Sequence, residues 1–398
     1  MKRPRKRRVA AWSLALVLAL LAAFFIFAPG IAERRMNMVD GGPLPEVSDE
    51  ARALHASLTV VDLHADTLLW QRNLLDRGTR GHVDLPRLRD GNVALQVLSS
   101  VTKSPAGLNN ERNSANARDD ITLLAIGQLQ PLRTWTSLLE RTLWHGEKLR
   151  RAVAASHGAL LRVTDNADLA QVLTARATPP RPVGVMLSVE GLHDLEGDIA
   201  NLPRLYDAGV RMAGLTHFFD NQLAGSMHGE AKGGLTPFGR QVVRAMEQRG
   251  MIVDLAHCSH QCVADVLALA RRPVVSSHGG VQATCPGNRN LTDEEIRGVA
   301  ATGGVIGIGY WDSAVCDISP AGIVRAMAHV RDLVGIEYVA LGSDFDGTVT
   351  TRFDTSQLAQ ITQALMQAGF SEAEIRAVLG GNALRVIAAG LVPMGPQA

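Results

Sequence analysis

Eight short apolar runs, most of them separated by longer helical patterns, constrain the fold of this chain more than any other feature. They are rich in Val and Ile and nearly continuous in hydrophobicity, which is typical of parallel strands buried on both faces. In chain order the runs are VVDLHAD (60–66), VALQVLSSV (93–101), PVGVMLSVE (182–190), RMAGLTH (211–217), MIVDLAH (251–257), PVVSSHG (273–279), GVIGIGY (304–310) and YVALGSDFDG (338–347).

The segments between these runs carry helix signals. Residues 236–250 begin with Thr-Pro and end in Gly, which are common start and stop residues of a helix, and residues 291–304 and 319–335 follow similar patterns. Strand and helix alternating eight times predict an α/β fold, a (β/α)8 barrel of the TIM type. A doubly wound open sheet is the alternative.

Two parts of the chain do not fit a simple repeat. Residues 102–181 are too many for one crossover, so we expect a helical insertion there, with one long or two broken helices in 119–156. A further short strand could lie in 159–165. We assign residues 49–398 to one catalytic domain that includes this insertion.

The N-terminus predicts a membrane anchor. Six of the first eight residues are basic, and residues 9–32 carry no charge. This stretch exceeds the roughly 20 residues that cross a bilayer, whereas a cleaved signal peptide usually has a core of about 7–15 residues. We therefore expect an uncleaved transmembrane helix in 1–32, a linker in 33–48, and, from the basic cluster, an extracytoplasmic catalytic domain.

The bulk composition argues against nucleic-acid binding. The formal net charge of the 398 residues is +1, so no overall field attracts a polyanion. Aromatic residues make up 4% of the chain, which provides few surfaces for base stacking.

Acidic and histidine residues gather at the carboxyl ends of the predicted strands. Alternate residues of a strand share a face, so Asp62, His64 and Asp66 are expected to point the same way. Active sites of such barrels lie at that end. Burying many ionisable groups together without a metal would be costly, so the pattern predicts a metal centre. The other strand-end residues are Glu190, His217, His257, His278 and Asp344.

The type of ligand indicates the metal and the reaction. Imidazoles and carboxylates without a thiolate favour catalytic zinc, with manganese or cobalt as alternatives. Four or five ligands that include a shared carboxylate can hold two ions. Ions about 3.5–4 Å apart can trap a bridging hydroxide and polarise a carbonyl oxygen. The sequence thus predicts hydrolysis of an amide-like bond.

Seven short motifs occur in the order and spacing of the membrane (renal) dipeptidases, and residues of about 50–390 resemble that family. The resemblance implies a (β/α)8 barrel with two zinc ions, a homodimer, and cleavage of dipeptides, often with a D-residue at the carboxyl side. Some members also open β-lactams. The motifs are LHAD, SVEG, LTH, DLAH, SSHGG, NRN and GSDFDG.

The resemblance also assigns the metal ligands. His64 and Asp66 resemble the ligands of one zinc ion, and Glu190 resembles the carboxylate that bridges the two ions. His257 and His278 resemble the ligands of the second ion.

Three further residues resemble parts of the catalytic machinery. His217 is similar to the histidine that stabilises the developing oxyanion. Arg289 is similar to the arginine that anchors the substrate carboxylate. Asp344 is similar to the acid that moves a proton from the attacking water to the leaving amine.

The resemblance has consequences for other positions. Ala65 stands where many members have Asn. Cys285 and Cys316 lie near positions bridged in animal members, which implies a disulfide. Cys258 and Cys262 are four residues apart, a spacing that invites a zinc site, although we favour core packing.

Several other polar residues receive structural interpretations. Asp254 alternates to the face opposite His257, so we expect it to support a neighbouring element. Asp346 is expected to be structural, and His193 and His260 to lie near the ligands or on the surface. Four histidines in predicted loops and helices are expected to be solvated: His82, His145, His157 and His329.

These features predict a membrane-anchored zinc dipeptidase. One alternative is another binuclear amidohydrolase that acts on acylated amino acids or lactams, because the same barrel supports several reactions. The other is a membrane-tethered binding protein without turnover, which would usually lack one or more of the ligands.

Overall fold

The computed structural model describes residues 3–394, and within them eight parallel strands close into a barrel. Each strand pairs with its neighbours, and the pairing of β3 with β5 closes the ring. The structure therefore confirms the (β/α)8 barrel and rules out the open sheet. The barrel strands are β2 (Val60–Ala65), β3 (Val93–Val101), β5 (Val183–Glu190), β6 (Val210–Gly214), β7 (Ile252–Asp254), β8 (Val275–Gly279), β9 (Val305–Ile308) and β10 (Val339–Leu341).

Several apolar runs extend beyond the strand that they contain. Every residue of the eight strands is buried, as their continuous hydrophobicity predicted. β6 ends three residues before His217, β7 three before His257, and β10 three before Asp344. The chemically interesting residues of these runs therefore lie on the loops that follow the strands.

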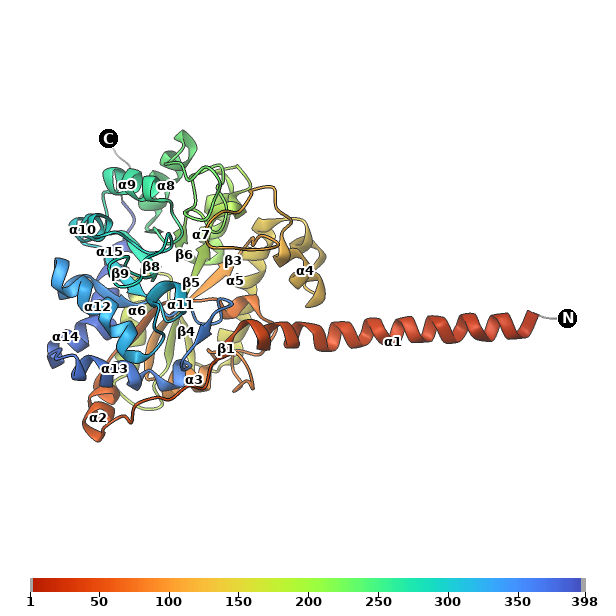
Figure 1. Ribbon diagram of the computed structural model, residues 1–398, viewed down its shortest axis with the longest axis horizontal. Coiled ribbons are helices and arrows are strands. Elements are labelled where there is room, and N and C mark those ends of the chain that lie inside the picture. Colours follow the sequence, from red (N-terminus) through yellow and green to blue (C-terminus); the bar gives the residue numbers. More distant parts are fainter. Residues whose placement is uncertain (1–2, 395–398) are drawn as a thin grey trace.

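The helices cover the outside of the barrel (Figure 1). α8 (Pro237–Arg249) is capped by Thr236 and ends at Gly250 in the left-handed region. α10 (Asp293–Ala301) and α12 (Pro320–Val334) lie where the sequence predicted them. The remaining outer helices are α2 (Asp49–Ser57), α3 (Leu85–Asp90), α6 (Asn166–Ala175), α7 (Asn201–Ala208), α9 (His260–Leu269), α11 (Asp312–Val315), α13 (Ala359–Gln367), α14 (Glu372–Arg376) and α15 (Asn382–Gly390).

The insertion after β3 contains two separate helices. α4 (Asp120–Gly127) and α5 (Leu138–Ala155) are joined through the short 3₁₀ helix η2 (Leu132–Trp135). The additional strand β4 (Leu160–Arg162) pairs with the start of β5. The broken helix and the extra strand were both among the expectations from the sequence.

One helix projects from the body as a rod (Figure 1). This helix, α1 (Arg3–Met36), contains the single span in the described residues that is long and apolar enough to cross a membrane. By this criterion alone it is a membrane anchor or a signal sequence.

The end of α1 is fastened to the barrel. The carboxylate of Glu33 is buried and accepts bonds of 2.6 Å from Arg72 Nε and from Arg80 Nε. The next segment forms β1 (Met38–Val39), which pairs with β11 (Thr350–Thr351) in the loop after β10. The stretch that the sequence predicted as a linker is thus bound to the body at its beginning.

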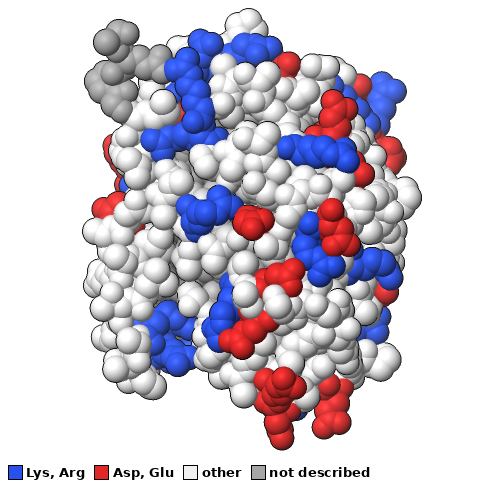
Figure 2. Space-filling view, turned by 90° about the vertical axis from the view of Figure 1, so that its left-hand side faces the viewer, with Lys and Arg blue, Asp and Glu red and all other residues white. Residues whose placement is uncertain are grey.

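The face turned away from α1 carries both signs of charge. Figure 2 shows Lys and Arg side chains interspersed with Asp and Glu and with wide uncharged areas between them. No single-sign field dominates this view of the molecule, in keeping with the near-zero net charge.

We expect Glu33→Gln to destabilise the protein by about 3 kcal/mol, because Arg72 and Arg80 both lose the buried carboxylate with which they pair. Thermal unfolding of the full chain in detergent micelles measures the effect. The matched control is Glu46→Gln, since Glu46 is exposed. Equal melting temperatures for both variants would contradict a structural role for the Glu33 ion pairs.

Candidate metal centre

The centre is built around the buried carboxylate of Glu190, the last residue of β5. Its Oε1 lies 2.8 Å from His257 Nε2, 3.1 Å from His278 Nε2 and 3.7 Å from His64 Nε2. Its Oε2 lies 3.4 Å from His217 Nε2. Four strands and their following loops therefore bring four imidazoles to one carboxylate.

The loop residue Asp66 completes one side of this cluster. Asp66 Oδ1 lies 3.4 Å from His64 Nε2, and Asp344 Oδ1 lies 3.8 Å from the same nitrogen. Asp62 does not join them: its carboxylate accepts bonds from His64 N, Gln96 Nε2 and Ser343 N, so it holds the strands together below the site.

The residues present fit bound metal. The Nε2 atoms of His257 and His278 lie 3.1 Å apart, and both face Glu190. Both ring nitrogens of His64 and one oxygen of Asp66 are buried without a hydrogen-bond partner. Buried polar atoms are normally satisfied, and cations at this cluster would satisfy them. Three sets of ligand atoms each lie within 4.8 Å of one another: His64, Asp66 and Glu190; Glu190, His217 and His257; His64, His278 and Asp344.

Neighbouring groups orient two of the imidazoles. His278 Nδ1 lies 2.9 Å from Ser277 Oγ, which donates to Asp254 at 2.5 Å. His217 Nδ1 donates to the carbonyl of Lys103 at 2.9 Å. Such partners fix the ring orientation and the tautomer of a metal-binding histidine. The sequence pattern did not indicate a role for Ser277 or for the Lys103 carbonyl, although Ser277 stands within the SSHGG motif.

Two residues of the cluster are held in unusual backbone conformations. His257 has φ of 65° and Asp344 has φ of 60°, in the left-handed region that non-glycine residues rarely adopt. Strained positions of this kind are concentrated at functional sites. Here they turn the chain just past β7 and β10, where both side chains enter the cluster.

The electrostatics favour positive charge at the centre. Burial alone would raise the pKa of Glu190, but His217 and His64 hold it well below its ordinary value. Burial lowers the pKa of His64, yet Asp66 and Glu190 outweigh this effect and raise it to about 10. Burial raises the pKa of Asp344 well above its ordinary value against the opposing effect of His64. The carboxylates of Asp66 and Glu190 thus stabilise positive charge beside His64, which suits a divalent cation there.

Arg289 lies on the loop between β8 and α10, beside the cluster. Its side chain is buried, and Nη2 donates to the carbonyl of His278 at 2.7 Å. The guanidinium carbon lies 5.4 Å from the centre of the Trp311 ring, within the range of a cation–π contact. These contacts hold a positive charge at the wall of the cavity next to the cluster.

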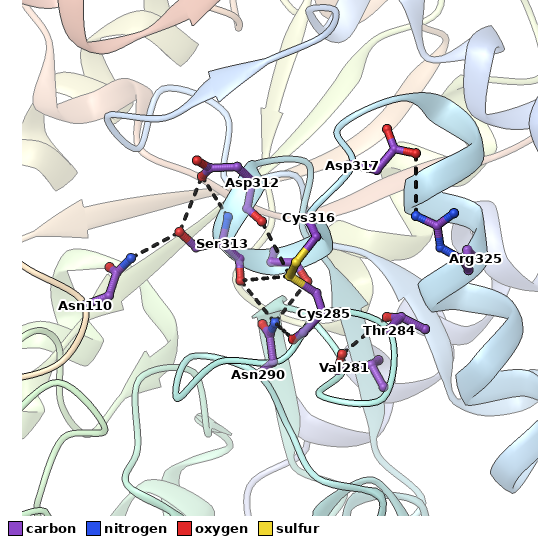
Figure 3. Close-up of a disulfide and its surroundings, with 11 residues drawn as sticks. Asn110, Val281, Thr284, Cys285, Asn290, Asp312, Ser313, Cys316, Asp317 and Arg325 are labelled. Atoms are coloured by element: carbon purple, nitrogen blue, oxygen red, sulfur yellow. Dashed lines mark hydrogen bonds and ion pairs between the residues drawn. A yellow bond between two sulfur atoms is a disulfide. The ribbon is translucent and has the colours of Figure 1, made fainter.

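A disulfide braces the loop that carries Arg289. Cys285 and Cys316 are bonded to each other (Figure 3), so the pairing that the resemblance implied is confirmed. Asn290 adds bonds from its side-chain nitrogen to Cys285 O and Ser313 O, at 2.7 and 3.0 Å. The disulfide and this amide tie the loop to the segment that contains Trp311.

The other cysteine pair lies in the core. Cys258 and Cys262 are free and buried, and their sulfurs are 2.9 Å apart. Both belong to the main hydrophobic cluster. This supports core packing over a zinc site at these positions.

A cavity of about 300 Å³ opens over the cluster. Its wall is divided into a polar and an apolar part. The polar part includes Asp66, Glu190, His217, His257, Arg289 and Asp344. The apolar part includes Leu69, Val101, Leu108, Ile121, Val349 and Trp311.

The prediction of exposure to solvent was wrong for two of the four histidines. His82 is fully buried and accepts a bond from Asp346 N at 3.0 Å. His145 is also buried and contacts Ser100 Oγ at 2.8 Å. Both histidines lie in segments with polar sequences. The packing of α5 against the barrel buries His145, and the packing of the loop after β2 buries His82.

The remaining singled-out residues lie mostly where the sequence placed them. His157 is exposed, and His329 is half-buried and paired with Asp293. His260 is exposed and paired with Glu295. His193 is buried.

Asp254 and Asp346 have the structural roles expected from the sequence. Asp254 accepts hydrogen bonds from Ala256 N and Ser277 N. Asp346 accepts hydrogen bonds from Thr67 Oγ1 and His82 N.

Comparison with known proteins identifies the family. A family model described as "Membrane dipeptidase (Peptidase family M19)" matches residues 48–390. The chain belongs to this family. The members of this family are metallopeptidases, enzymes that hydrolyse peptide bonds.

Individual relatives agree with this assignment. "Dipeptidase aclJ" of Aspergillus oryzae is 29% identical over 93% of this chain and 86% of its own length. The structure of the probable dipeptidase PvdM from Pseudomonas aeruginosa matches with a TM-score of 0.71 at 20% identity, covering 86% of this chain and 98% of PvdM. The structure of a metallopeptidase from Rhodobacter sphaeroides, bound to a phosphinate mimic of the dipeptide L-Ala-D-Ala, matches with a TM-score of 0.66 at 22% identity. The match covers 84% of this chain and 99% of that protein.

We expect Glu190→Gln to lose bound metal, because a neutral amide replaces the one carboxylate that contacts all the imidazoles. Metal content per chain, measured by elemental analysis after dialysis, reports the loss. Asp194→Asn is the control, since Asp194 is a buried carboxylate four residues further along that bonds to Thr142 rather than to the cluster. Equal metal content in both variants would remove Glu190 from the ligand set.

Replacing Cys285 and Cys316 together by serine should lower the free energy of unfolding by about 2–4 kcal/mol, because the unfolded chain regains the freedom of the closed loop. Denaturant unfolding of the full chain measures this. The Cys258→Ala variant keeps the disulfide and serves as a comparison for the loss of a sulfur elsewhere. An unchanged midpoint for the double variant would contradict a stabilising role for the bridge.

Proposed function

We propose that this protein is a zinc-dependent dipeptidase that binds two zinc ions and accepts dipeptides with a carboxyl-terminal D-residue. The observation that carries the proposal is the position of Glu190, which belongs to two sets of ligand atoms that each lie within 4.8 Å of one another, one with His64 and Asp66 and one with His217 and His257. His64 and Asp66 would hold one ion and His257 and His278 the other, with Glu190 shared between them. When bound, the two ions would activate a water molecule and polarise the peptide carbonyl.

Arg289 is proposed to bind the substrate carboxylate. Its guanidinium lies at the cavity wall close to the cluster and is held in place by the His278 carbonyl. A guanidinium can bind a carboxylate through two parallel hydrogen bonds. This fixes the length of substrate that fits between Arg289 and the metal centre, which favours dipeptides over longer chains.

His217 is proposed to stabilise the oxyanion that develops on the peptide carbonyl. Its Nδ1 proton is donated to Lys103 O. This bond fixes the orientation of the ring, and Nε2 lies in the lining of the cavity, 3.4 Å from Glu190 Oε2. A positioned imidazole in a site shielded from water can stabilise an oxyanion.

Asp344 is proposed to move the proton. Its carboxyl group lines the cavity, lies 3.8 Å from His64 Nε2, and has a pKa well above its ordinary value because burial disfavours the charged form. A carboxyl group with a raised pKa can accept a proton from the attacking water and release it to the departing amine.

The proposed cellular location is supported by α1 and the disulfide. We propose that α1 anchors the chain in a membrane and that the catalytic domain lies outside the cytoplasm. Disulfides such as Cys285–Cys316 persist in oxidising compartments, which supports this orientation. We also propose a homodimer, as the family resemblance implies, which sedimentation of the detergent-solubilised chain would test.

The test of the activity uses the full chain in detergent micelles with zinc. L-Ala-D-Ala and L-Ala-L-Ala are compared, with a chelated sample and Glu190→Gln as controls. We expect cleavage of both dipeptides, abolished in both controls. Absence of cleavage by a preparation shown to contain two metal ions would refute the dipeptidase and favour the alternative of acylated amino acids or lactams, for which the apolar cavity wall offers space.

Arg289→Lys should reduce kcat/KM for L-Ala-D-Ala by about 100-fold, equivalent to about 3 kcal/mol of lost transition-state stabilisation. The same dipeptide with an amidated carboxyl end should lose much less, because it has no carboxylate for the arginine to bind. The ratio of the two effects is the measurement. Equal losses for the acid and the amide would assign Arg289 a purely structural role.

A further inference from the structure

Three exposed leucines lie close together in the sequence of the insertion, between residues 123 and 132. Leu123 of α4, Leu129 of the following turn and Leu132 of η2 are 52%, 63% and 72% exposed. We refer to these three residues as the leucine patch. Soluble surfaces seldom cluster large apolar side chains in this way, and such clusters usually mark an interaction site. Leu129 also has φ of 53°, an uncommon conformation for a leucine, so the turn that presents it is specifically formed.

The leucine patch lies beside the point where α1 leaves the body. Figure 1 shows α4 next to the base of the projecting helix. Pro29 of α1 is buried there, and its Cγ is 3.9 Å from the position that a Cβ on Gly127 of α4 would occupy. The patch residues thus flank the contact between α1 and α4 in the sequence.

The length of α1 places this contact at a membrane surface. An α-helix rises about 1.5 Å per residue, so about 20 residues span the roughly 30 Å of a hydrocarbon core. Counted from Val9, where the uncharged stretch begins, the span ends next to Pro29. The exposed Arg34 and Arg35 follow just over one turn later, and long basic side chains near the end of a membrane helix can reach the polar interface.

The body cannot swing freely about this point. Glu33 joins the last turns of α1 to Arg72, and Arg72 also pairs with Asp346 in the loop after β10. Asn37 Oδ1 accepts a bond of 2.8 Å from Thr348 N in the same loop. Because α1 is fixed to the barrel by these bonds and by the β1–β11 pairing, its orientation in a membrane sets the face that the body turns toward the lipid.

We propose that the leucine patch is inserted into the outer leaflet of the membrane that α1 crosses, so that the active-site cavity opens beside the lipid surface. This rests on the proposed anchoring of α1. The cavity wall includes Ile121 of α4 and Thr350 of β11. The first belongs to the helix that α1 contacts, and the second to the strand that pairs with β1, so the entrance borders the base of α1.

The patch is suited to lipid because it continues the apolar surface of α1. The exposed residues of α1 near its outer end include Phe27 and Ile31, and Pro29 between them contacts α4. Insertion of the leucines would remove apolar side chains from water at the depth where α1 already displaces lipid. A second copy of the chain is the competing occupant, and the experiment distinguishes the two.

The test measures contact with lipid at single positions of the full chain in lipid nanodiscs. Leu129→Cys, Ile31→Cys and Val392→Cys are each labelled with a small fluorophore, and each is required to keep the melting temperature of the parent. Ile31 reports the outer end of α1, whereas Val392 is exposed and follows α15, which lies on the side of the body away from α1 (Figure 1). The native cysteines are buried or disulfide-bonded and do not compete for the label.

The quencher is a phospholipid with a nitroxide near its headgroup. We expect the labels at positions 31 and 129 to be quenched to a similar extent and the label at 392 to remain bright. Quenching at 31 without quenching at 129 would overturn the proposal while leaving the anchor intact. If the label at 129 is then also protected from aqueous iodide, a second copy covers the patch.

Loss of quenching at position 31 would show that α1 is not in the bilayer, which refutes the anchoring and the patch together. Neither result depends on dipeptidase activity, so the proposed reaction is tested separately. A measurement on the unlabelled chain supports the assignment: a photoactivatable phospholipid should crosslink to residues 120–135 and not to 372–390.

Discussion

The buried carboxylate of Glu190 is the interaction on which the site depends. A charge at this depth is tolerated only where partners compensate it, and here four imidazoles surround its two oxygens. Those imidazoles come from segments up to 214 residues apart in the chain, between His64 and His278. Closure of the barrel brings these imidazoles together. The geometry of the candidate metal centre therefore depends on the intact ring of strands.

The loops that follow the strands fix the positions of the side chains in the site. His257 and Asp344 occupy left-handed conformations that the surrounding contacts must hold in place. Asp254 and Ser277 support His278, and the disulfide with Asn290 supports the loop of Arg289. His278 and Arg289, for which we propose metal binding and substrate binding, therefore each have their own supporting contacts, as precise positioning of a site requires.

Buried ion pairs extend this support to the base of α1. Asp346, two residues beyond Asp344, is buried between Arg72, Thr67 and His82, and Arg72 continues to Glu33 at the base of α1. The loop that carries Asp344 is thereby linked to the helix through buried ion pairs. These buried ion pairs fix the orientation of the active site relative to α1.

The sequence by itself determined the strands, the main helices and the set of strand-end residues, because buried parallel strands and capped helices have local patterns. It placed the segments around His82 and His145 in solvent wrongly, since burial there comes from elements distant in the chain. Only the tertiary structure decided that Asp62 supports the strands while His64 faces Glu190, because both follow the same alternation in sequence. It likewise decided that Glu33 joins α1 to the barrel, since a buried ion pair between distant residues leaves no local pattern.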